Sequence, residues 1–262
     1  MTDPLPPSPR ALASGEDDAA AAKRAMAWTH TARFLTTASK LSELPVSELA
    51  EIAFVGRSNA GKSTAINVLT QQKRLAFASK TPGRTQHINL FELGPKLAPD
   101  ALFADLPGYG YAAVERSKKL RWQEVMAQYL ETRRNLAAIV LLLDSRLGFT
   151  EIDRNLLEFV SPRVGNGSVR LLALLTKIDK LNRRDTERAV AEATVVIEQA
   201  ATDESDFAVA TFSALSRTGV DDVALFLNEC MRAASRATDA AGRAKSTGAG
   251  EGAQNAQKPL SG

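Results

Sequence analysis

The stretch "GRSNAGKST" (Gly56–Thr64) follows the apolar segment "EIAFV" and runs into the helical pattern "STAINVLTQQ". It matches the phosphate-binding loop pattern G-x-x-x-x-G-K-S between a predicted strand and a predicted helix. Glycines let backbone N–H groups curl around an anion without Cβ clashes, and the helix N-terminus adds partial positive charge. Lys62 would reach the outer phosphates of a nucleotide, and the Ser63 hydroxyl would ligate Mg²⁺. We therefore predict a nucleotide phosphate site rather than a Gly-rich turn with a solvated lysine.

Length and composition allow one globular domain with tails. The chain has 262 residues, and 44% of them are hydrophobic, too many for a disordered chain. The longest apolar run, "LAAIVLLL" at 136–143, is far shorter than the roughly 20 residues that span a bilayer. "MTDPLPPSPR" lacks the apolar core of a secretory signal, and the single cysteine, Cys230, cannot form a disulfide framework or a cysteine metal site. These features predict a soluble protein of the cytoplasm, whereas the net charge of +3 says little about partners.

Strands alternate with helices between the two ends of the chain. Most expected strands are continuous apolar runs, which is typical of strands buried on both faces, and they lie at 52–55, 88–93, 101–104, 138–143, 170–175 and 207–211. The segment "HINLFEL" alternates more and is expected at an edge. The pattern predicts an α/β fold in three layers, with about six mostly parallel strands, one antiparallel edge strand and helices on both faces.

Hydrophobic spacing predicts the buried faces of several helices. Thr150 and Asp153 form a capping-box pattern that would open a helix. The inward residues are expected to be Leu120, Trp122, Val125, Met126, Tyr129 and Leu130; Ile152, Leu156 and Phe159; Val190, Ala193 and Ile197; and Val220, Val223, Leu227 and Cys230.

The two ends lack periodicity. Residues 1–23 are rich in Pro, Ala and Asp, and 233–262 contain no aromatic residue. Neither segment carries enough apolar surface to offset the entropy of ordering, so we expect disordered extensions around a folded domain at 24–232.

The segment "ALFADLPG" suggests a sensor for the last phosphate. Asp105 would end a strand beside the phosphate loop, where it can hold Mg²⁺ through water, and the Gly108 N–H can bond a γ-phosphate. An aspartate in an ordinary Pro-Gly turn would give the same pattern.

Two further segments bear on the base. In "LLALLTKID", the Asp179 carboxylate can accept from N1–H and N2–H of guanine, a donor pair that adenine lacks, and the Lys177 stem can lie along the base. In "TFSALS", Ser213, Ala214 or Leu215 can present a backbone N–H to guanine O6. A lysine-rich strand exit and a plain loop are the alternatives.

The segment "KTPGRTQH" (Lys80–His87) is polar and broken by Gly and Pro, which predicts a mobile loop. Thr85 would complete the Mg²⁺ shell when a γ-phosphate is present, giving an order–disorder switch.

Together these segments resemble the translation-factor-like class of GTPases. "GRSNAGKST", "KTPGRTQ", "DLPGYGYA" and "TKID", with "ARFLTTASKLSELP" upstream, resemble the EngB (YihA/YsxC) family of ribosome-biogenesis GTPases over about residues 32–231. The resemblance implies a monomeric bacterial cytoplasmic GTPase that assists assembly of the large ribosomal subunit and so supports cell division. The usual base-recognition box begins with Asn, and Thr176 in its place would weaken a side-chain contact to the phosphate loop.

The predicted site follows from these segments. Lys62, Thr85 and Gly108 are the predicted catalytic residues, and Ser63, Thr85 and Asp105 the predicted Mg²⁺ ligands. The predicted GTP/GDP site comprises Gly56, Arg57, Ser58, Asn59, Ala60, Gly61, Lys62, Ser63, Thr64, Gly83, Arg84, Thr85, Gln86, His87, Asp105, Leu106, Pro107, Gly108, Thr176, Lys177, Ile178, Asp179, Phe212, Ser213 and Ala214.

The expected turnover is slow. A Ras-type enzyme orients the attacking water with a Gln directly after the D-x-x-G turn, and here that position is Tyr109, so a rate on the order of 10⁻⁴ s⁻¹ is expected. Several related GTPases use an Asn at the position of Asn59 to hold K⁺ against the phosphates; a turn-forming Asn is the alternative.

Several residues have both an RNA-binding and a structural interpretation. Tyr109 and Tyr111 can stack on bases, although partial burial in a mobile loop is the expectation. An RNA-facing surface or a solvated helix face would explain Arg116, Lys118, Lys119, Arg121, Arg133 and Arg134. Two rival functions stay open: an ATP-dependent small-molecule kinase, and a non-catalytic scaffold that depends on guanine nucleotide.

Overall fold

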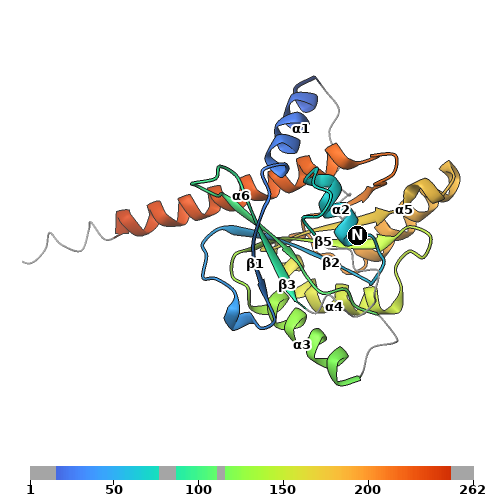
Figure 1. The fold of residues 1–262 in the computed structure, drawn as a ribbon, viewed down its shortest axis with the longest axis horizontal. Helices are drawn as coiled ribbons and strands as arrows, with labels where there is room; N and C mark the ends of the chain where they lie inside the picture. Colours follow the sequence, from blue (N-terminus) through green and yellow to red (C-terminus); the bar gives the residue numbers. More distant parts are fainter. Residues whose placement is uncertain (1–15, 77–86, 111–115, 249–262) are drawn as a thin grey trace, which may run out of the picture.

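The computed structural model describes residues 16–76, 87–110 and 116–248. Within them, seven strands form one sheet in the order β1-β3-β4-β2-β5-β6-β7 (Figure 1). The strands are β1 (Arg33–Ala38), β2 (Ala50–Gly56), β3 (Ile88–Leu93), β4 (Ala101–Asp105), β5 (Leu136–Asp144), β6 (Arg170–Thr176) and β7 (Phe207–Thr211). The helices are α1 (Glu16–Thr29), α2 (Lys62–Leu69), α3 (Arg116–Thr132), α4 (Glu151–Gly165), α5 (Arg183–Glu198) and α6 (Val220–Gly248), with short 3₁₀ turns η1 (Leu41–Glu43) and η2 (Ile178–Lys180).

The predicted α/β architecture is confirmed. Strands β4, β2, β5, β6 and β7 are all parallel, and β3 pairs antiparallel with both β4 and β1. Since parallel strands end at the same edge of a sheet, the loops after β2, β4, β5, β6 and β7 meet there.

The sheet edge differs from the expectation. The expected set lacked β1, which occupies the edge, so β3 lies one position inside. Two adjacent apolar side chains of β1, Phe34 and Leu35, are both exposed, and the pairing with β3 shifts register between Phe34 and Thr36. The segment therefore has neither a clean alternation nor a buried apolar run, which are the two patterns that identify strands.

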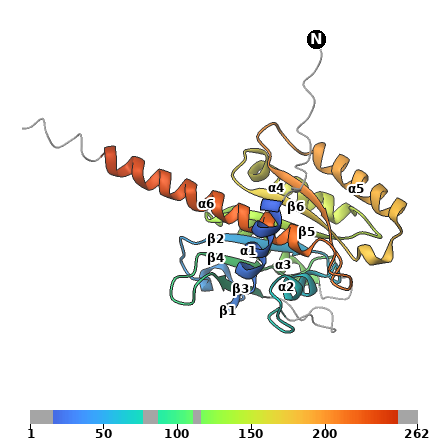
Figure 2. The same ribbon diagram turned by 90° about the horizontal axis from the view of Figure 1, so that it is seen from above.

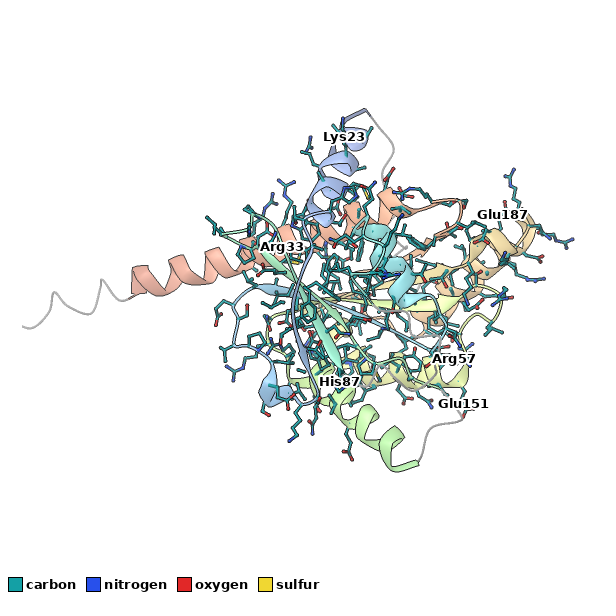
Figure 3. The ribbon with its side chains drawn as sticks, viewed as in Figure 1. Lys23, Arg33, Arg57, His87, Glu151 and Glu187 are labelled. Atoms are coloured by element: carbon teal, nitrogen blue, oxygen red, sulfur yellow. The ribbon has the colours of Figure 1, made fainter. Side chains whose placement is uncertain are left out.

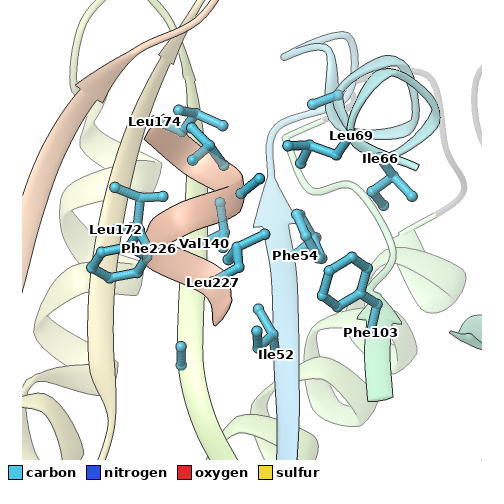
Figure 4. Packing of buried hydrophobic residues seen from close by; sticks show 14 of the residues in the cluster. Ile52, Phe54, Ile66, Leu69, Phe103, Val140, Leu172, Leu174, Phe226 and Leu227 are labelled. Atoms are coloured by element: carbon cyan, nitrogen blue, oxygen red, sulfur yellow. The ribbon is translucent and has the colours of Figure 1, made fainter. Parts of the chain in front are cut away.

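Each face of the sheet carries its own helices and its own core. On β2, Ile52 and Phe54 point toward the core formed with α1, α2 and α6, whereas Ala53 and Val55 point toward the core formed with α3, α4 and α5. Figure 4 shows Ile52, Phe54 and Phe103 from the sheet packing below Ile66 and Leu69 of α2 and beside Leu227 of α6. These two cores hold the sheet rigid beneath the loops of its C-terminal edge (Figure 2).

The helix faces are confirmed where burial is described, except on α4. Leu120 and Trp122 lie outside the residues whose side chains are described, and Val125 and Val190 are half-buried. Asp153 accepts hydrogen bonds from the Thr150 backbone N–H (2.9 Å) and hydroxyl (2.6 Å), so the predicted capping box is present. Ile152 and Phe159, which were expected to point inward, are 37% and 42% exposed. Only Leu156 of the predicted three is buried, and the helix packs instead through Leu156, Leu157, Val160 and Val164. The other buried predictions hold for Met126, Tyr129, Leu130, Ala193, Ile197, Val220, Val223, Leu227 and Cys230.

The expectation of disorder is wrong for 16–23 and 233–248, which are helical. Helix α1 packs across α6, and its Ala25 and Met26 join the core; Figure 1 shows α6 continuing well beyond the body of the domain. Both segments are rich in alanine, the strongest helix former, and low hydrophobicity alone hides that propensity. No helix in the described ranges combines the length and apolar character needed to cross a membrane.

Arg133 belongs to a buried ion pair at the opposite end of the sheet. Its guanidinium donates to the Glu51 carboxylate (2.6 Å from Nη2), and the Tyr129 hydroxyl donates to the same group. Glu51 is fully buried, so its charge requires these partners. The Glu51 hydrogen bonds also raise the pKa of Arg133. Arg133 is therefore structural rather than RNA-facing or solvated, whereas Arg134 is exposed.

The two phenylalanines Phe54 and Phe159 test this account of the core. Phe54 is fully buried with its ring 5.0 Å from that of Phe103, so Phe54→Ala should lower the free energy of unfolding by about 3–5 kcal/mol. Phe159→Ala, on the exposed side of α4, should cost much less. Urea unfolding of both variants checks this, and equal losses would contradict it.

Candidate functional site

The phosphate loop joins β2 to α2 in the conformation that its sequence predicts. A Cβ on Gly56 would lie 2.8 Å from the Leu142 carbonyl oxygen of β5, so glycine is required for this approach. Asn59 and Gly61 have positive φ angles of 68° and 93°, which curl the loop ahead of α2. The backbone amides at the start of α2 therefore face a common space at the C-terminal edge of the sheet.

Lys62 and Asp105 meet in that space. The Lys62 ammonium contacts Oδ1 of Asp105, and both side chains are buried. Oδ2 of Asp105 is buried and has no hydrogen-bond partner among the described residues. A buried carboxylate oxygen without a partner, in reach of the Ser63 end of the loop, fits a site for a divalent cation.

The turn after β4 lies directly against the phosphate loop. The Ser58 N–H donates to the Tyr109 carbonyl (2.8 Å), and a Cβ on Gly108 would lie 3.3 Å from the Ser58 nitrogen. The Leu106 N–H donates to the Phe54 carbonyl of β2 (3.1 Å). The structure thus brings together the two segments that were predicted to form the phosphate end of the site.

Tyr109 itself is buried rather than available to RNA. Its side chain is 6% exposed, and its hydroxyl donates to Oδ1 of Asp153 (2.7 Å). The expectation that Tyr109 is buried rather than stacked on RNA is confirmed, but the side chain is buried more deeply than the expected partial burial, and its partner on α4 carried no sequence signal. Tyr111 lies outside the described residues.

The predicted base-recognition residues also converge. The Ser213 hydroxyl donates to Oδ1 of Asp179 (2.7 Å) and lowers the pKa of that carboxyl below its ordinary value, so Asp179 is held as a carboxylate. The Asp179 side chain is only 16% exposed although the residue's backbone is open to solvent. Sequence reasoning assigned Ser213 a backbone role; instead its N–H donates to the Thr218 carbonyl (3.0 Å), and the backbone donors left for a base are those of Ala214 and Leu215.

The Thr176 side chain contacts the phosphate loop, although Thr in place of the usual Asn was expected to weaken this contact. Its hydroxyl lies 2.6 Å from the Ala60 carbonyl oxygen of the phosphate loop and 3.0 Å from that of Leu143. Thr176 therefore makes a buried side-chain contact to the phosphate loop despite the departure from Asn.

Lys177 connects the base side of the site to the phosphate side. Its ammonium donates to the Asn59 carbonyl (2.6 Å) and to Oδ2 of Asp144 (2.8 Å). Asp144 also receives three hydrogen bonds from Arg146, two from its guanidinium and one from its backbone N–H, and these, together with Lys177, hold the pKa of Asp144 well below its ordinary range. Sequence reasoning missed Asp144 and Arg146; the signal was an acidic residue ending the apolar strand in "LLLDSR".

The structure does not describe most of the predicted loop Lys80–His87. Gly83, Arg84, Thr85 and Gln86 lie outside the described residues. His87 lies at the start of the next described range, where its Nδ1 is 2.8 Å from the Ser39 hydroxyl after β1; Figure 3 labels it on the lower side of the sheet.

Comparison with known proteins gives the family. Residues 51–177 match a family described as "50S ribosome-binding GTPase". The probable GTP-binding protein EngB of Acidovorax ebreus is 61% identical over 77% of this chain and 89% of that protein. The protein of the same name from Burkholderia thailandensis is 47% identical over 80% and 95%.

Solved structures share the fold. A crystal structure of a probable GTP-binding protein EngB has a TM-score of 0.52 at 20% identity and covers 70% of this chain and 99% of that one. Era in complex with MgGDPNP and a 16S ribosomal RNA fragment has a TM-score of 0.54 at 22% identity and covers 70% and 56%. The curated relatives, with the matching family, establish that the chain belongs to the EngB family of GTP-binding proteins and is a GTPase.

Proposed function

We propose that this GTPase is a cytoplasmic switch that binds the large ribosomal subunit in its GTP state, assists assembly of that subunit and so supports cell division. The observation that supports the switch is the position of the Gly108 turn directly against the phosphate loop, and we propose that its N–H meets the γ-phosphate there. The ribosomal partner is supported by the description of the matching family, "50S ribosome-binding GTPase".

The chain's own residues supply most of the groups that phosphoryl transfer needs. Lys62 neutralises the outer phosphates, the loop amides hold the β-phosphate, and the Gly108 N–H meets the γ-phosphate. Asp105 and Ser63 would hold Mg²⁺, with Thr85 as a further proposed ligand. The bound ion would supply the positive charge that offsets charge developing on the phosphate oxygens.

We assign the selection of guanine over adenine to Asp179. Ser213 donates to its Oδ1 and the Lys180 ammonium lies 3.4 Å from its Oδ2, which keep the carboxylate oriented and ionised, and the remaining lone pairs of the two oxygens would accept from the donor pair of guanine. An ATP-dependent kinase would gain nothing from this arrangement, so we favour the switch over that rival.

Intrinsic hydrolysis should be slow and open to activation by K⁺. The Tyr109 hydroxyl is engaged by Asp153 and does not replace the water-orienting Gln. Asn59 is exposed in the loop, and its left-handed backbone also fits the turn-forming alternative. We propose that its side chain holds K⁺ against the phosphates.

Substitution Asp179→Asn tests base selection. The amide NH₂ would face the guanine donors, so GTP affinity should fall about 100-fold or more. Xanthosine triphosphate, whose C2 carbonyl can accept from that NH₂, should bind the variant better than the native protein does. Titration of both nucleotides checks this, with the exposed Asp203→Asn as the matched control; an unchanged GTP affinity would contradict the assignment.

Potassium dependence tests the role of Asn59. Steady-state turnover of the native protein should be higher in KCl than in NaCl at equal ionic strength, and Asn59→Ala should remove the difference. Asn155→Ala, an exposed position on α4, should retain it. Equal rates of the native protein in both salts would end the proposal.

Sedimentation with ribosomal subunits tests the partner and the direction of the switch. The protein should pellet with the large subunit in a non-hydrolysable GTP analogue and stay in the supernatant in GDP. Asp179→Asn should abolish pelleting with the GTP analogue. Identical behaviour in both nucleotides, or pelleting with the small subunit alone, would refute the proposal.

A further inference from the structure

Tyr109 follows Gly108 directly, but its side chain leaves the nucleotide site altogether. The ring is buried, and the hydroxyl donates to Oδ1 of Asp153 in the first turn of α4. This contact joins the turn after β4 to the first turn of α4; Figure 3 labels Glu151, where α4 begins, and Arg57 of the neighbouring phosphate loop. Arg57 and Asp153 also line one pocket of about 200 Å³ beside the loop.

Asp153 is a fixed acceptor. It is 1% exposed, and its Oδ2 takes the hydrogen bonds from the Thr150 backbone and hydroxyl. Its position at the N-terminus of α4 stabilises the negative charge further. Burial and the charge of Asp153 raise the pKa of Tyr109 well above its usual value, so the hydroxyl stays protonated and remains a donor at neutral pH.

The backbone of Tyr109 is held as firmly as its side chain. Its N–H donates to the Gly56 carbonyl (3.3 Å), and its carbonyl accepts from the Ser58 N–H (2.8 Å). Tyr109 thus has three attachments, two to the phosphate loop and one to α4. Because only one planar peptide unit separates Gly108 from Tyr109, the contacts of Tyr109 also restrain Gly108.

We propose that Tyr109 is a positioning residue which, through Asp153, holds the Gly108 turn in place for the γ-phosphate and so favours GTP over GDP. The inference rests on the proposed switch. GDP has no γ-phosphate and makes no use of Gly108, so ordering of the turn affects only the triphosphate. When the turn is already ordered, GTP binding does not have to supply the cost of ordering it.

The experiment compares affinities for a non-hydrolysable GTP analogue and for GDP by calorimetry. In Tyr109→Phe the ring still packs but the hydroxyl is lost, so affinity for the analogue should fall about five- to tenfold while that for GDP changes less than about twofold. The matched control is Tyr129→Phe, which deletes another buried hydroxyl that donates to a buried carboxylate, that of Glu51. It should leave the ratio of the two affinities unchanged.

Two further variants separate this role from general loss of stability. Thr150→Val removes one bond to Asp153 but leaves the acceptor for Tyr109, so the ratio should stay near the native value. Asp153→Ser withdraws the acceptor and should shift the ratio as Tyr109→Phe does. The double variant Tyr109→Phe/Asp153→Ser should shift the affinity ratio little further than either single variant, because both changes remove the same hydrogen bond.

The outcomes distinguish the inference from the function. If native protein prefers guanine nucleotides but Tyr109→Phe keeps the native ratio, or if Tyr129→Phe shifts the ratio equally, the positioning role is wrong and the switch stands. If the native protein binds neither guanine nucleotide, both the positioning role of Tyr109 and the proposed switch are wrong.

Discussion

The candidate site depends on the position of β2 between β4 and β5. Glycine at the end of β2 allows the chain to pass within van der Waals reach of the Leu142 carbonyl and then curl into the phosphate loop. The parallel neighbours end at the same edge, so β4 delivers Asp105 to Lys62 and β5 delivers Asp144 to Lys177. Any other strand order would separate these charges.

The charged groups of the site restrain one another. Lys177 bridges the Asn59 carbonyl and Asp144, Thr176 contacts the Ala60 carbonyl, and Ser213 orients Asp179. Among them, the Thr176 contact is buried and is strengthened relative to an exposed pair, whereas the Lys177 contact to Asn59 is open to solvent. The phosphate loop is therefore tied to the ends of β5 and β6, and the Asp179 carboxylate is held separately by the loop after β7.

The motifs could be predicted because their chemistry is local. A glycine-rich loop between an apolar strand and a helix, and the strand ends that carry Asp105 and Asp179, are visible in runs of eight or nine residues. The six apolar strands were predictable for the same reason. Strand β1 was not, because Phe34 and Leu35 are exposed at the sheet edge, and the helical parts of α1 and α6 were hidden by a composition that disorder and alanine-rich helix share.

The sequence by itself determined that a strand, a glycine-rich loop and a helix follow one another, and that Asp179 follows the next-to-last strand, because residues close in the chain specify these features. Only the tertiary structure decided that Tyr109 binds Asp153, that Arg133 neutralises buried Glu51, and that Ser213 serves Asp179 through its side chain. Those partners are 44, 82 and 34 residues apart. No local pattern encodes such a pair, because the fold, and not the spacing along the chain, brings the two side chains into contact.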